Sequence, residues 1–180
     1  MRVSRSAKKD IVLVLSNIRS AYNAGAIFRT ADAVGVSLIY LTGTTPAPED
    51  RFGRKRKDIQ KTALGAESSV SWKYEKRVGL VLKKLKKQGF ICAALEQDEK
   101  AISYRKFFAK NKKPIALFLG NEVEGLSESV KKKCDVILEI PMRGIFSRQK
   151  NHPKHTRIRK ESLNVSVAAG IALFEIVGKS

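Results

Sequence analysis

The chain has 180 residues, 43% of them hydrophobic, which suffices for one buried core and excludes a disordered chain. Lys and Arg together number 36 against 17 Asp and Glu, and the formal net charge of +19 favours an anionic partner. Nucleic acid is the first choice and a membrane surface the second, because the sequence holds no basic amphipathic helix rich in aromatic residues. Cys92 and Cys134 make no disulfide framework, which indicates a reducing cytoplasm. The most apolar stretch, residues 165–177, is too short to span a bilayer, so we expect no membrane contact.

The first half of the chain predicts a β-α-β unit. Residues 10–16 (DIVLVLS) form a buried strand, Asn23 can cap a helix that ends at Gly35, and residues 36–41 form the next strand. A loop rich in Gly, Thr and Pro covers residues 43–57 and ends in the basic run RFGRKRK. A short helix over 58–64 and a short strand over 70–74 follow.

The second half continues the alternation. Residues 76–88 predict a helix, 90–95 a strand, and 100–113 are basic with weak patterning. Strands over 115–119 and 136–140 flank a short helix over 127–133. The final helix, 162–177, is apolar nearly all round, which predicts burial on more than one side and contact with a second copy of the chain. We therefore predict an α/β fold with a mostly parallel sheet flanked by helices, in a single domain over residues 1–180.

Three polar clusters adjoin these buried elements. They are residues 115–126 (IALFLGNEVEGL), 137–144 (ILEIPMRG) and 161–175 (ESLNVSVAAGIALFE). Ligands of open α/β sheets bind outside the carboxyl ends of the strands, so these loops predict one pocket. Taken singly, each residue has a plainer explanation: Asn23 as a cap, Arg29 as a surface arginine, Glu124 as an acid at a helix start.

Familiar catalytic sets are mostly missing from the sequence. Residues 120–125 match neither the dinucleotide-binding fingerprint nor the phosphate-binding P-loop. His152 and His155 lie in a basic stretch without a nearby thiol or carboxylate, so we expect no metal site.

Together the motifs resemble a known family. Residues 23–31 (NAGAIFRTA) resemble the first motif of the TrmH/SpoU branch of the SPOUT superfamily, the S-adenosylmethionine-dependent RNA ribose 2′-O-methyltransferases. Residues 119–126 (LGNEVEGL) are similar to the second motif, and 140–144 (IPMRG) with 161–166 (ESLNVS) to the third. A lesser family segment is similar to residues 61–67 (KTALGAE).

This resemblance implies a SPOUT fold with a deep C-terminal trefoil knot, a homodimer, S-adenosylmethionine as the cofactor, and tRNA or rRNA as the substrate. It also implies the roles of individual residues. The implied catalytic residues are Asn23, Arg29, Glu122, Ser162 and Asn164. The implied cofactor-binding residues are Leu95, Gly120, Ile140, Met142 and Leu163.

A basic insertion divides the third motif. Residues 145–160 (IFSRQKNHPKHTRIRK) carry six cations and no acid. The segment is expected to be an arm or lid that grips RNA, or alternatively a solvated loop; the basic charge of the whole chain favours RNA contact. The expected RNA-binding residues are Arg29, Arg148, Lys150, Arg157 and Arg159.

Two other functions compete with RNA methylation. A non-catalytic RNA-binding protein on the same scaffold explains the charge equally well, but it does not require Arg29, Glu122, Ser162 and Asn164 all to be present. A nucleotide-dependent oxidoreductase is disfavoured because the glycine fingerprint is missing and the chain is strongly basic.

Overall fold

The computed structural model describes residues 10–144 and 162–178. In these two ranges seven strands form a single sheet, and every pair of neighbouring strands is parallel. The strands are β1 (Ile11–Ser16), β2 (Leu38–Thr42), β3 (Trp72–Glu75), β4 (Ile91–Leu95), β5 (Ile102–Ser103), β6 (Ile115–Leu119) and β7 (Val136–Glu139). Their order across the sheet is β3-β2-β1-β6-β4-β7-β5, which confirms the α/β class with a parallel sheet.

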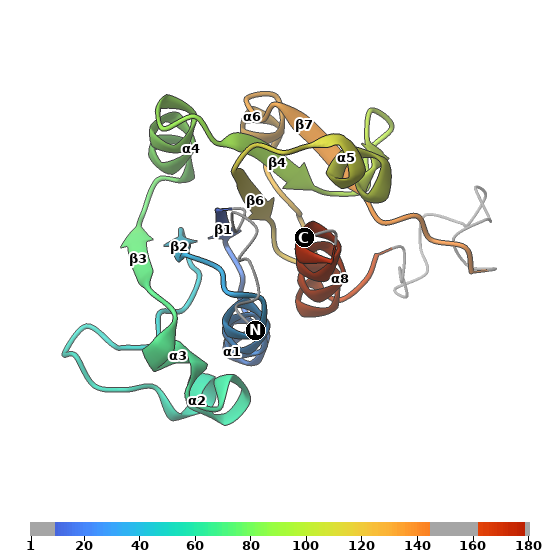
Figure 1. Ribbon diagram of the computed structural model, residues 1–180. Coiled ribbons are helices and arrows are strands. Elements are labelled where there is room, and N and C mark those ends of the chain that lie inside the picture. Colours follow the sequence, from blue (N-terminus) through green and yellow to red (C-terminus); the bar gives the residue numbers. More distant parts are fainter. Residues whose placement is uncertain (1–9, 145–161, 179–180) are drawn as a thin grey trace, which may run out of the picture.

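Helices cover both faces of the sheet (Figure 1). One face carries α1 (Ala21–Val34), α2 (Lys57–Ala63), α3 (Ala66–Ser69), α5 (Tyr104–Lys110) and α8 (Val165–Val177). The other face carries α4 (Val78–Lys87) and α6 (Glu128–Lys131). None of the helices within the two described ranges is long and apolar enough to cross a membrane.

The central strands are apolar on both sides because helices bury both faces. All six residues of β1 and all five of β6 are buried. Leu13 and Leu15 pack toward α1 and α8, whereas Val12 and Val14 pack toward α4, as the two-residue period of a strand requires. This arrangement fixes the register of β1 against both β2 and β6.

Helix α1 begins at Ala21, earlier than a cap at Asn23 would allow. Ser20 is the N-cap, and its Oγ accepts a hydrogen bond of 3.2 Å from the backbone N–H of Asn23. The side chain of Asn23 is therefore free for other contacts. At the other end, the helix ends at Gly35 as predicted, and Gly35 adopts the left-handed conformation of a C-cap with a φ of 72°.

Helix α8 begins at Val165 rather than at residue 162. Asn164 is its cap, with Oδ1 accepting hydrogen bonds from the N–H and Oγ of Ser166. Residues 162–164 therefore belong to a loop beside the sheet rather than to the helix. The expected knot depends on the path of residues 145–161, which lie outside the described residues.

Three short elements were not predicted from the sequence. Helix α3 is four residues long and β5 is two, which is below the length at which periodicity is readable. Helix α5 buries Tyr104 and Phe108, spaced four apart, among exposed cations that mask the pattern. Strand β5 is the edge strand next to β7 and α5 packs beside it and α8, whereas α3 packs on α1 and α2.

Candidate functional site

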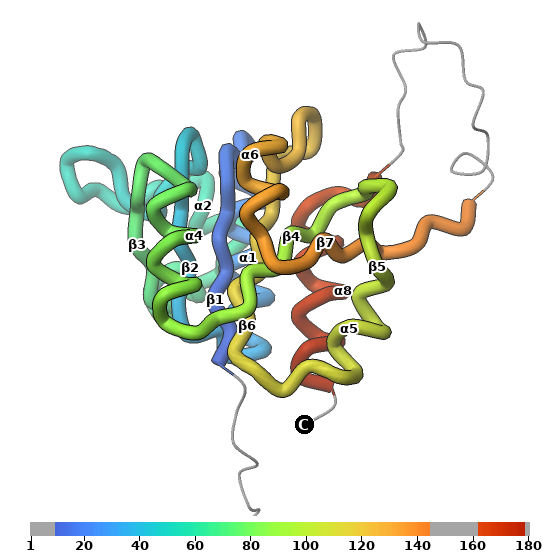
Figure 2. The backbone as a smooth tube through the Cα atoms, turned by 90° about the horizontal axis from the view of Figure 1, so that it is seen from above, coloured from blue at the N-terminus to red at the C-terminus, as the bar shows by residue number. Residues whose placement is uncertain are grey.

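The loops that carry the three motifs leave the sheet at one edge, as expected of a parallel sheet. Loops 17–20 after β1 and 120–126 after β6 are neighbours at the point where the strand order reverses (Figure 2). Residue 96 follows β4 and residue 140 follows β7 at the same edge. The N-terminus of α8 completes the group, so segments from the whole chain meet at one place.

The loop after β6 is a tight turn built on two glycines and one asparagine. The Oδ1 of Asn121 accepts the backbone N–H groups of Val123 (2.9 Å) and Glu124 (2.8 Å), and Asn121 is buried. Gly125 has a φ of 65° and donates its N–H to the carbonyl of Asn121 at 3.0 Å. A Cβ at Gly120 would lie 2.2 Å from the carbonyl carbon of Gly125. The loop therefore closes back on its own start.

Three of the five expected catalytic residues form one hydrogen-bonded array. The Nδ2 of Asn23 donates to Oε1 of Glu122 in a short contact, and the Nδ2 of Asn164 donates to Oδ1 of Asn23 at 3.2 Å. Each residue comes from a different motif. These contacts also fix which amide atom of Asn164 is oxygen and which is nitrogen. Its Oδ1 accepts a hydrogen bond from Ser166 at the helix cap, so its Nδ2 is the atom that donates to Asn23.

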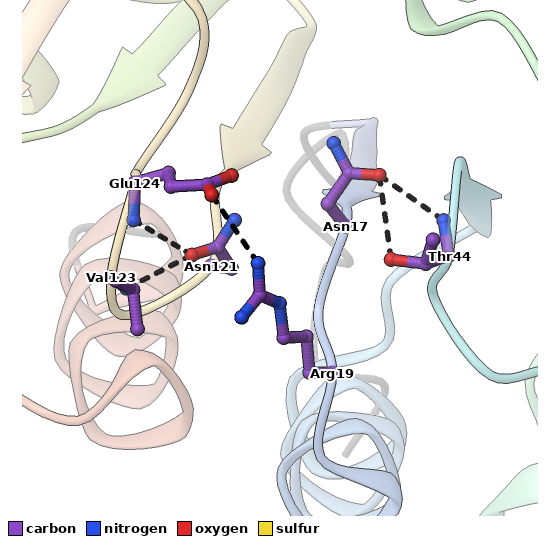
Figure 3. A network of polar contacts seen from close by, with 6 residues as sticks. All are labelled: Asn17, Arg19, Thr44, Asn121, Val123 and Glu124. Atoms are coloured by element: carbon purple, nitrogen blue, oxygen red, sulfur yellow. Dashed lines mark hydrogen bonds and ion pairs between the residues drawn. The ribbon is translucent and has the colours of Figure 1, made fainter.

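A second set of contacts joins the neighbouring loops (Figure 3). Arg19 points across from the loop after β1 and donates to Oε1 of Glu124 at 3.3 Å. The Oδ1 of Asn17 accepts from the backbone N–H of Thr44 at 3.1 Å, which ties the loop after β1 to the loop after β2. The side chains of Arg19 and Glu124 are 62% and 67% exposed, so this ion pair contributes little stability and mainly orients the two loops.

Next to the array lies a cavity of about 360 Å³, within the size range of small-molecule sites. Four of the five expected cofactor-binding residues line it, together with the expected catalytic residues Glu122 and Ser162. These four are Leu95, Gly120, Ile140 and Leu163. The fifth, Met142, is half-buried and lies outside the lining.

The cavity is acidic although the chain is strongly basic. Glu96, Glu122, Glu124 and Glu128 line it, with Lys131 as the one cation among the described lining residues. Lys131 forms ion pairs with Asp98 (2.8 Å) and Glu128 (2.5 Å), and these hydrogen bonds raise its pKa. Because its charge is already balanced, the lining is left with excess negative charge and favours a ligand that carries positive charge.

Glu96 is a site residue that the sequence analysis missed. Its Oε1 accepts the backbone N–H of Leu126 at 2.6 Å, and a Cβ at Gly125 would lie 2.9 Å from both of its oxygens. The carboxylate therefore fastens the loop after β6 to the end of β4. The available signal was position, since Glu96 is the first polar residue after a buried strand, at the carboxyl end where ligands bind.

Burial raises the pKa of Glu96 above that of an ordinary glutamate, against the opposing hydrogen bond from Leu126. The folded chain then holds the proton more tightly than the unfolded chain does. The contribution of Glu96 to stability is therefore full below the ordinary glutamate pKa and is lost as the pH rises through the raised value.

We expect Glu96→Gln to flatten the dependence of unfolding free energy on pH between acidic and neutral conditions, while its amide oxygen still accepts the N–H of Leu126. Urea unfolding at a series of pH values measures this slope. The exposed Glu99 gives the matched control, and Glu99→Gln should keep the parent slope. If the unfolding free energy of Glu96→Gln depends on pH as steeply as that of the parent chain, this explanation of the buried carboxylate is wrong.

Arg29, the remaining residue of the first motif, lies apart from the array. It follows Asn23 by six residues, about 9 Å along the helix and roughly 120° around it. Its side chain is exposed and has no hydrogen bond or ion pair with any residue in ranges 10–144 and 162–178. The expected RNA contacts Arg148, Lys150, Arg157 and Arg159, like His152 and His155, lie outside the described residues.

The two cysteines are not reactive groups at neutral pH. Burial raises the pKa of the Cys92 and Cys134 thiols to about 12, so neither is a nucleophile at neutral pH. Within the ranges that the structure describes, no three side chains of His, Cys, Asp or Glu gather to hold a metal ion.

The chain is similar to proteins of known families. Over 175 residues it is 30% identical to the 23S rRNA (guanosine-2′-O-)-methyltransferase RlmB of Xanthomonas axonopodis, covering 97% of this chain and 61% of the relative. It is 31% identical over 168 residues to a putative TrmH family tRNA/rRNA methyltransferase of Staphylococcus haemolyticus, covering 93% and 58%. The chain thus spans about three fifths of the length of these curated relatives.

Solved structures give the same result. The TrmH/SpoU tRNA modifying enzyme of A. aeolicus matches with a TM-score of 0.74 and 29% identity, over 95% of this chain and 75% of the other. An AdoMet-bound rRNA methyltransferase of Sinorhizobium meliloti matches with a TM-score of 0.73 and 25% identity, over 94% and 56%. The model of the SpoU rRNA Methylase family matches residues 10–147, more than half of the chain. The chain therefore belongs to the SpoU rRNA Methylase family, the TrmH/SpoU branch that its motifs resemble.

Proposed function

We propose that this chain is an S-adenosylmethionine-dependent methyltransferase that methylates a ribose 2′-hydroxyl in structured RNA, either tRNA or rRNA. One observation carries the proposal: Asn23, Glu122 and Asn164, from three separate motifs, form a continuous hydrogen-bonded array at the rim of an acidic cavity. The names of similar proteins support the same reaction, since the RlmB relative is a guanosine-2′-O-methyltransferase.

The cavity fits the proposed cofactor in size and in charge. Apolar side chains of Leu95, Ile140 and Leu163 offer a surface for the adenosine part, and nearby carboxylates favour a cation. When bound, S-adenosylmethionine supplies an electrophilic methyl group on a positively charged sulfur. An AdoMet-bound structure within the group of similar proteins supports this choice. We assign Leu95, Gly120, Ile140 and Leu163 to the cofactor, with Met142 at its outer edge.

The polar array has the chemistry needed to aim a ribose hydroxyl. Glu122 uses Oε1 for Asn23, and its Oε2 has no hydrogen-bond partner in ranges 10–144 and 162–178. We assign this oxygen to accept a hydrogen bond from the 2′-hydroxyl, which orients the oxygen lone pair toward the methyl group. Asn23 and Asn164 hold the carboxylate in place, and Ser162 lies on the cavity wall where the sugar enters.

Arg29 is assigned to the RNA rather than to proton transfer. A guanidinium stays protonated across the accessible pH range and is a poor general base. Its exposed position, with no partner in ranges 10–144 and 162–178, suits a contact with the phosphate next to the target sugar, where it stabilises negative charge on the reacting oxygen. The phosphate or Glu122 then takes the proton that the 2′-oxygen loses as its bond to the methyl carbon forms.

The +19 charge supports an RNA partner, and the basic insertion 145–160 is assigned to the same contact. Incubation with tritiated S-adenosylmethionine and total RNA tests the function. We expect radiolabel in the RNA. A non-catalytic RNA-binding protein would bind the RNA and leave it unlabelled, and that outcome would refute the proposal.

We also propose a homodimer in the cytoplasm with the C-terminal knot that the family resemblance implies. Support for the dimer comes from α8, which buries one face in the core and leaves apolar side chains on another. Val167, Ile171 and Phe174 recur at spacings of four and three and therefore share a face. Val167 is 49% exposed and Phe174 is 56% exposed in the isolated chain, which indicates a surface that a second copy covers.

We expect Phe174→Arg to convert the dimer into a folded monomer, because a buried unpaired charge opposes association. Light scattering coupled to size exclusion measures the mass, and circular dichroism confirms folding. Leu80→Arg is the matched control, since Leu80 is 42% exposed on α4, across the sheet from α8, and should leave the mass unchanged. A dimeric Phe174→Arg chain would place the interface elsewhere.

A further inference from the structure

The loop between β2 and α2 holds a feature that the proposed site does not use. Residues 48–56 form a small hairpin at the carboxyl end of β2, with an antiparallel bridge between Glu49 and Lys55. The N–H of Arg56 returns to the carbonyl of Pro48 at 2.9 Å. In Figures 1 and 2 this loop projects from the body of the protein beside α2.

Asp50 holds the turn of this hairpin in one conformation. Its Oδ1 accepts the N–H groups of Phe52 (2.8 Å) and Arg54 (3.0 Å), and its Oδ2 accepts Nε of Arg54 at 2.7 Å. The N–H of Gly53 bonds to the carbonyl of Asp50 at 3.0 Å, and Gly53 has a φ of 74°. A hairpin that is already ordered loses little conformational entropy when it binds a partner.

The tip of the turn presents an aromatic ring to solvent beside two guanidinium groups. Phe52 is 66% exposed and belongs to neither hydrophobic cluster of the described chain. The Cζ atoms of Arg51 and Arg54 lie 4.7 and 5.0 Å from the ring centroid. Cations this close hold the ring upright by cation–π attraction while most of the residue stays accessible. Folding of the chain gains nothing from exposing this ring.

We propose that Phe52, with Arg51 and Arg54, is a stacking site for an unpaired nucleobase of the RNA substrate, an inference that rests on the proposed function. An exposed aromatic ring beside guanidinium groups is the chemistry that binds single-stranded RNA, since bases stack on the ring and phosphates pair with the cations. A paired base inside a duplex has no free face to offer, so this site selects RNA with a loop or bulge.

The position of the hairpin agrees with this role. The strands of the described sheet are all parallel, so the loop after β2 leaves the same edge of the sheet as the loop after β6 that carries Glu122. The loops after β1 and β2 are joined directly by Asn17 and Thr44. An RNA bound at the candidate site can therefore run along this edge and reach Phe52, which lies in the loop two strands away from the loop that carries Glu122.

Two RNA probes with equal numbers of phosphates test the proposal on the full chain. One is a hairpin with an unpaired loop, and the other is a blunt duplex. We expect Phe52→Ala to weaken hairpin binding roughly 5- to 100-fold, the range for loss of one stacked base, with little effect on the duplex. The salt slope should stay at the parent value because no phosphate contact is lost. Arg51→Gln should reduce that slope by about 0.7 to 0.9.

Two further variants make the result independent of folding and of general surface effects. Leu80→Ala removes an exposed apolar side chain on α4 and should bind both probes as the parent does. Phe52→Trp in a Trp72→Phe background carries a single tryptophan, whose fluorescence should be quenched by the hairpin but not by the duplex. This second readout does not require Phe52→Ala to be stable.

The outcomes separate this inference from the proposed function. The stacking site would be overturned if Phe52→Ala bound the RNA hairpin as tightly as the parent chain does, or if the RNA hairpin left the fluorescence of the Phe52→Trp chain unquenched. Either result would hold even if the parent chain methylates RNA. If Phe52→Ala loses the mass of the dimer, the protein loop 48–56 is instead a contact between two copies of the chain. That result would also overturn the stacking site. A parent chain that binds neither probe would refute the RNA function together with the inference.

Discussion

Arg29→Ala is expected to lower the kcat of methyl transfer by about 100- to 1,000-fold, the usual effect of removing one group that stabilises charge in a transition state. The fold should survive, because the side chain is exposed and bonds to no other residue in the two described ranges. Affinity for S-adenosylhomocysteine should also be kept, since Arg29 does not line the cavity. Single-turnover kinetics on labelled RNA and calorimetry with the product cofactor measure the two effects separately.

Arg77→Ala is the matched control. Arg77 is also an exposed arginine, it precedes α4 on the other side of the sheet, and its removal changes the net charge by the same amount. We expect it to retain nearly all activity. If Arg29→Ala turns over at nearly the parent rate, Arg29 is not part of the catalytic set. If Arg29→Ala and Arg77→Ala lose activity equally, Arg29 contributes only to the net positive charge of the chain.

Gly120→Ala is expected to abolish cofactor binding and to lower the unfolding free energy by about 1–3 kcal/mol, the cost of forcing an extra methyl group into packed atoms. The new Cβ would lie 2.2 Å from the carbonyl carbon of Gly125 and 2.4 Å from the nitrogen of Leu126. Both neighbours are backbone atoms, which cannot rotate away, so the whole loop after β6 must move. The contacts of Glu122 with Asn23 and of Glu96 with Leu126 depend on that loop.

Gly79→Ala provides a control in which the same substitution should raise the unfolding free energy rather than lower it. Gly79 lies within α4 with no atom inside 4 Å of the added Cβ, so alanine should stabilise that helix by up to about 1 kcal/mol. Thermal unfolding and cofactor calorimetry on both variants give the comparison. Tight cofactor binding by Gly120→Ala would show that the cavity beside this loop is not the cofactor site.

The buried strands and long helices were predictable from the sequence because their patterns are strong. Residues 115–119 form a continuous apolar run, and strand β6 covers the same five positions. The boundary of α1 was less predictable, because Ser20 and Asn23 are both good caps and only tertiary contacts decide between them. Asn23 bonds to Glu122 and Asn164, which lie 99 and 141 residues away along the chain, and no local rule contains that preference.

The candidate site was predictable in its residues but not in its geometry. Family motifs located Asn23, Glu122 and Asn164, whereas the acidic lining depends on Glu96, Glu124 and Glu128, which three different segments contribute. Glu96 has no sequence motif, and its role rests on a single hydrogen bond to a backbone group 30 residues away. In the sequence Phe52 is only part of a basic run, because its exposure and its two guanidinium neighbours depend on the fold.

We propose that the array of Asn23, Glu122 and Asn164 directs a methyl group onto a ribose oxygen of RNA. Alkaline hydrolysis of RNA labelled by the enzyme tests it directly, because a methylated 2′-oxygen can no longer attack the adjoining phosphate. We expect the label to appear in alkali-resistant dinucleotides and to disappear with Asn164→Ala. Label recovered in single nucleotides methylated on the base would contradict it.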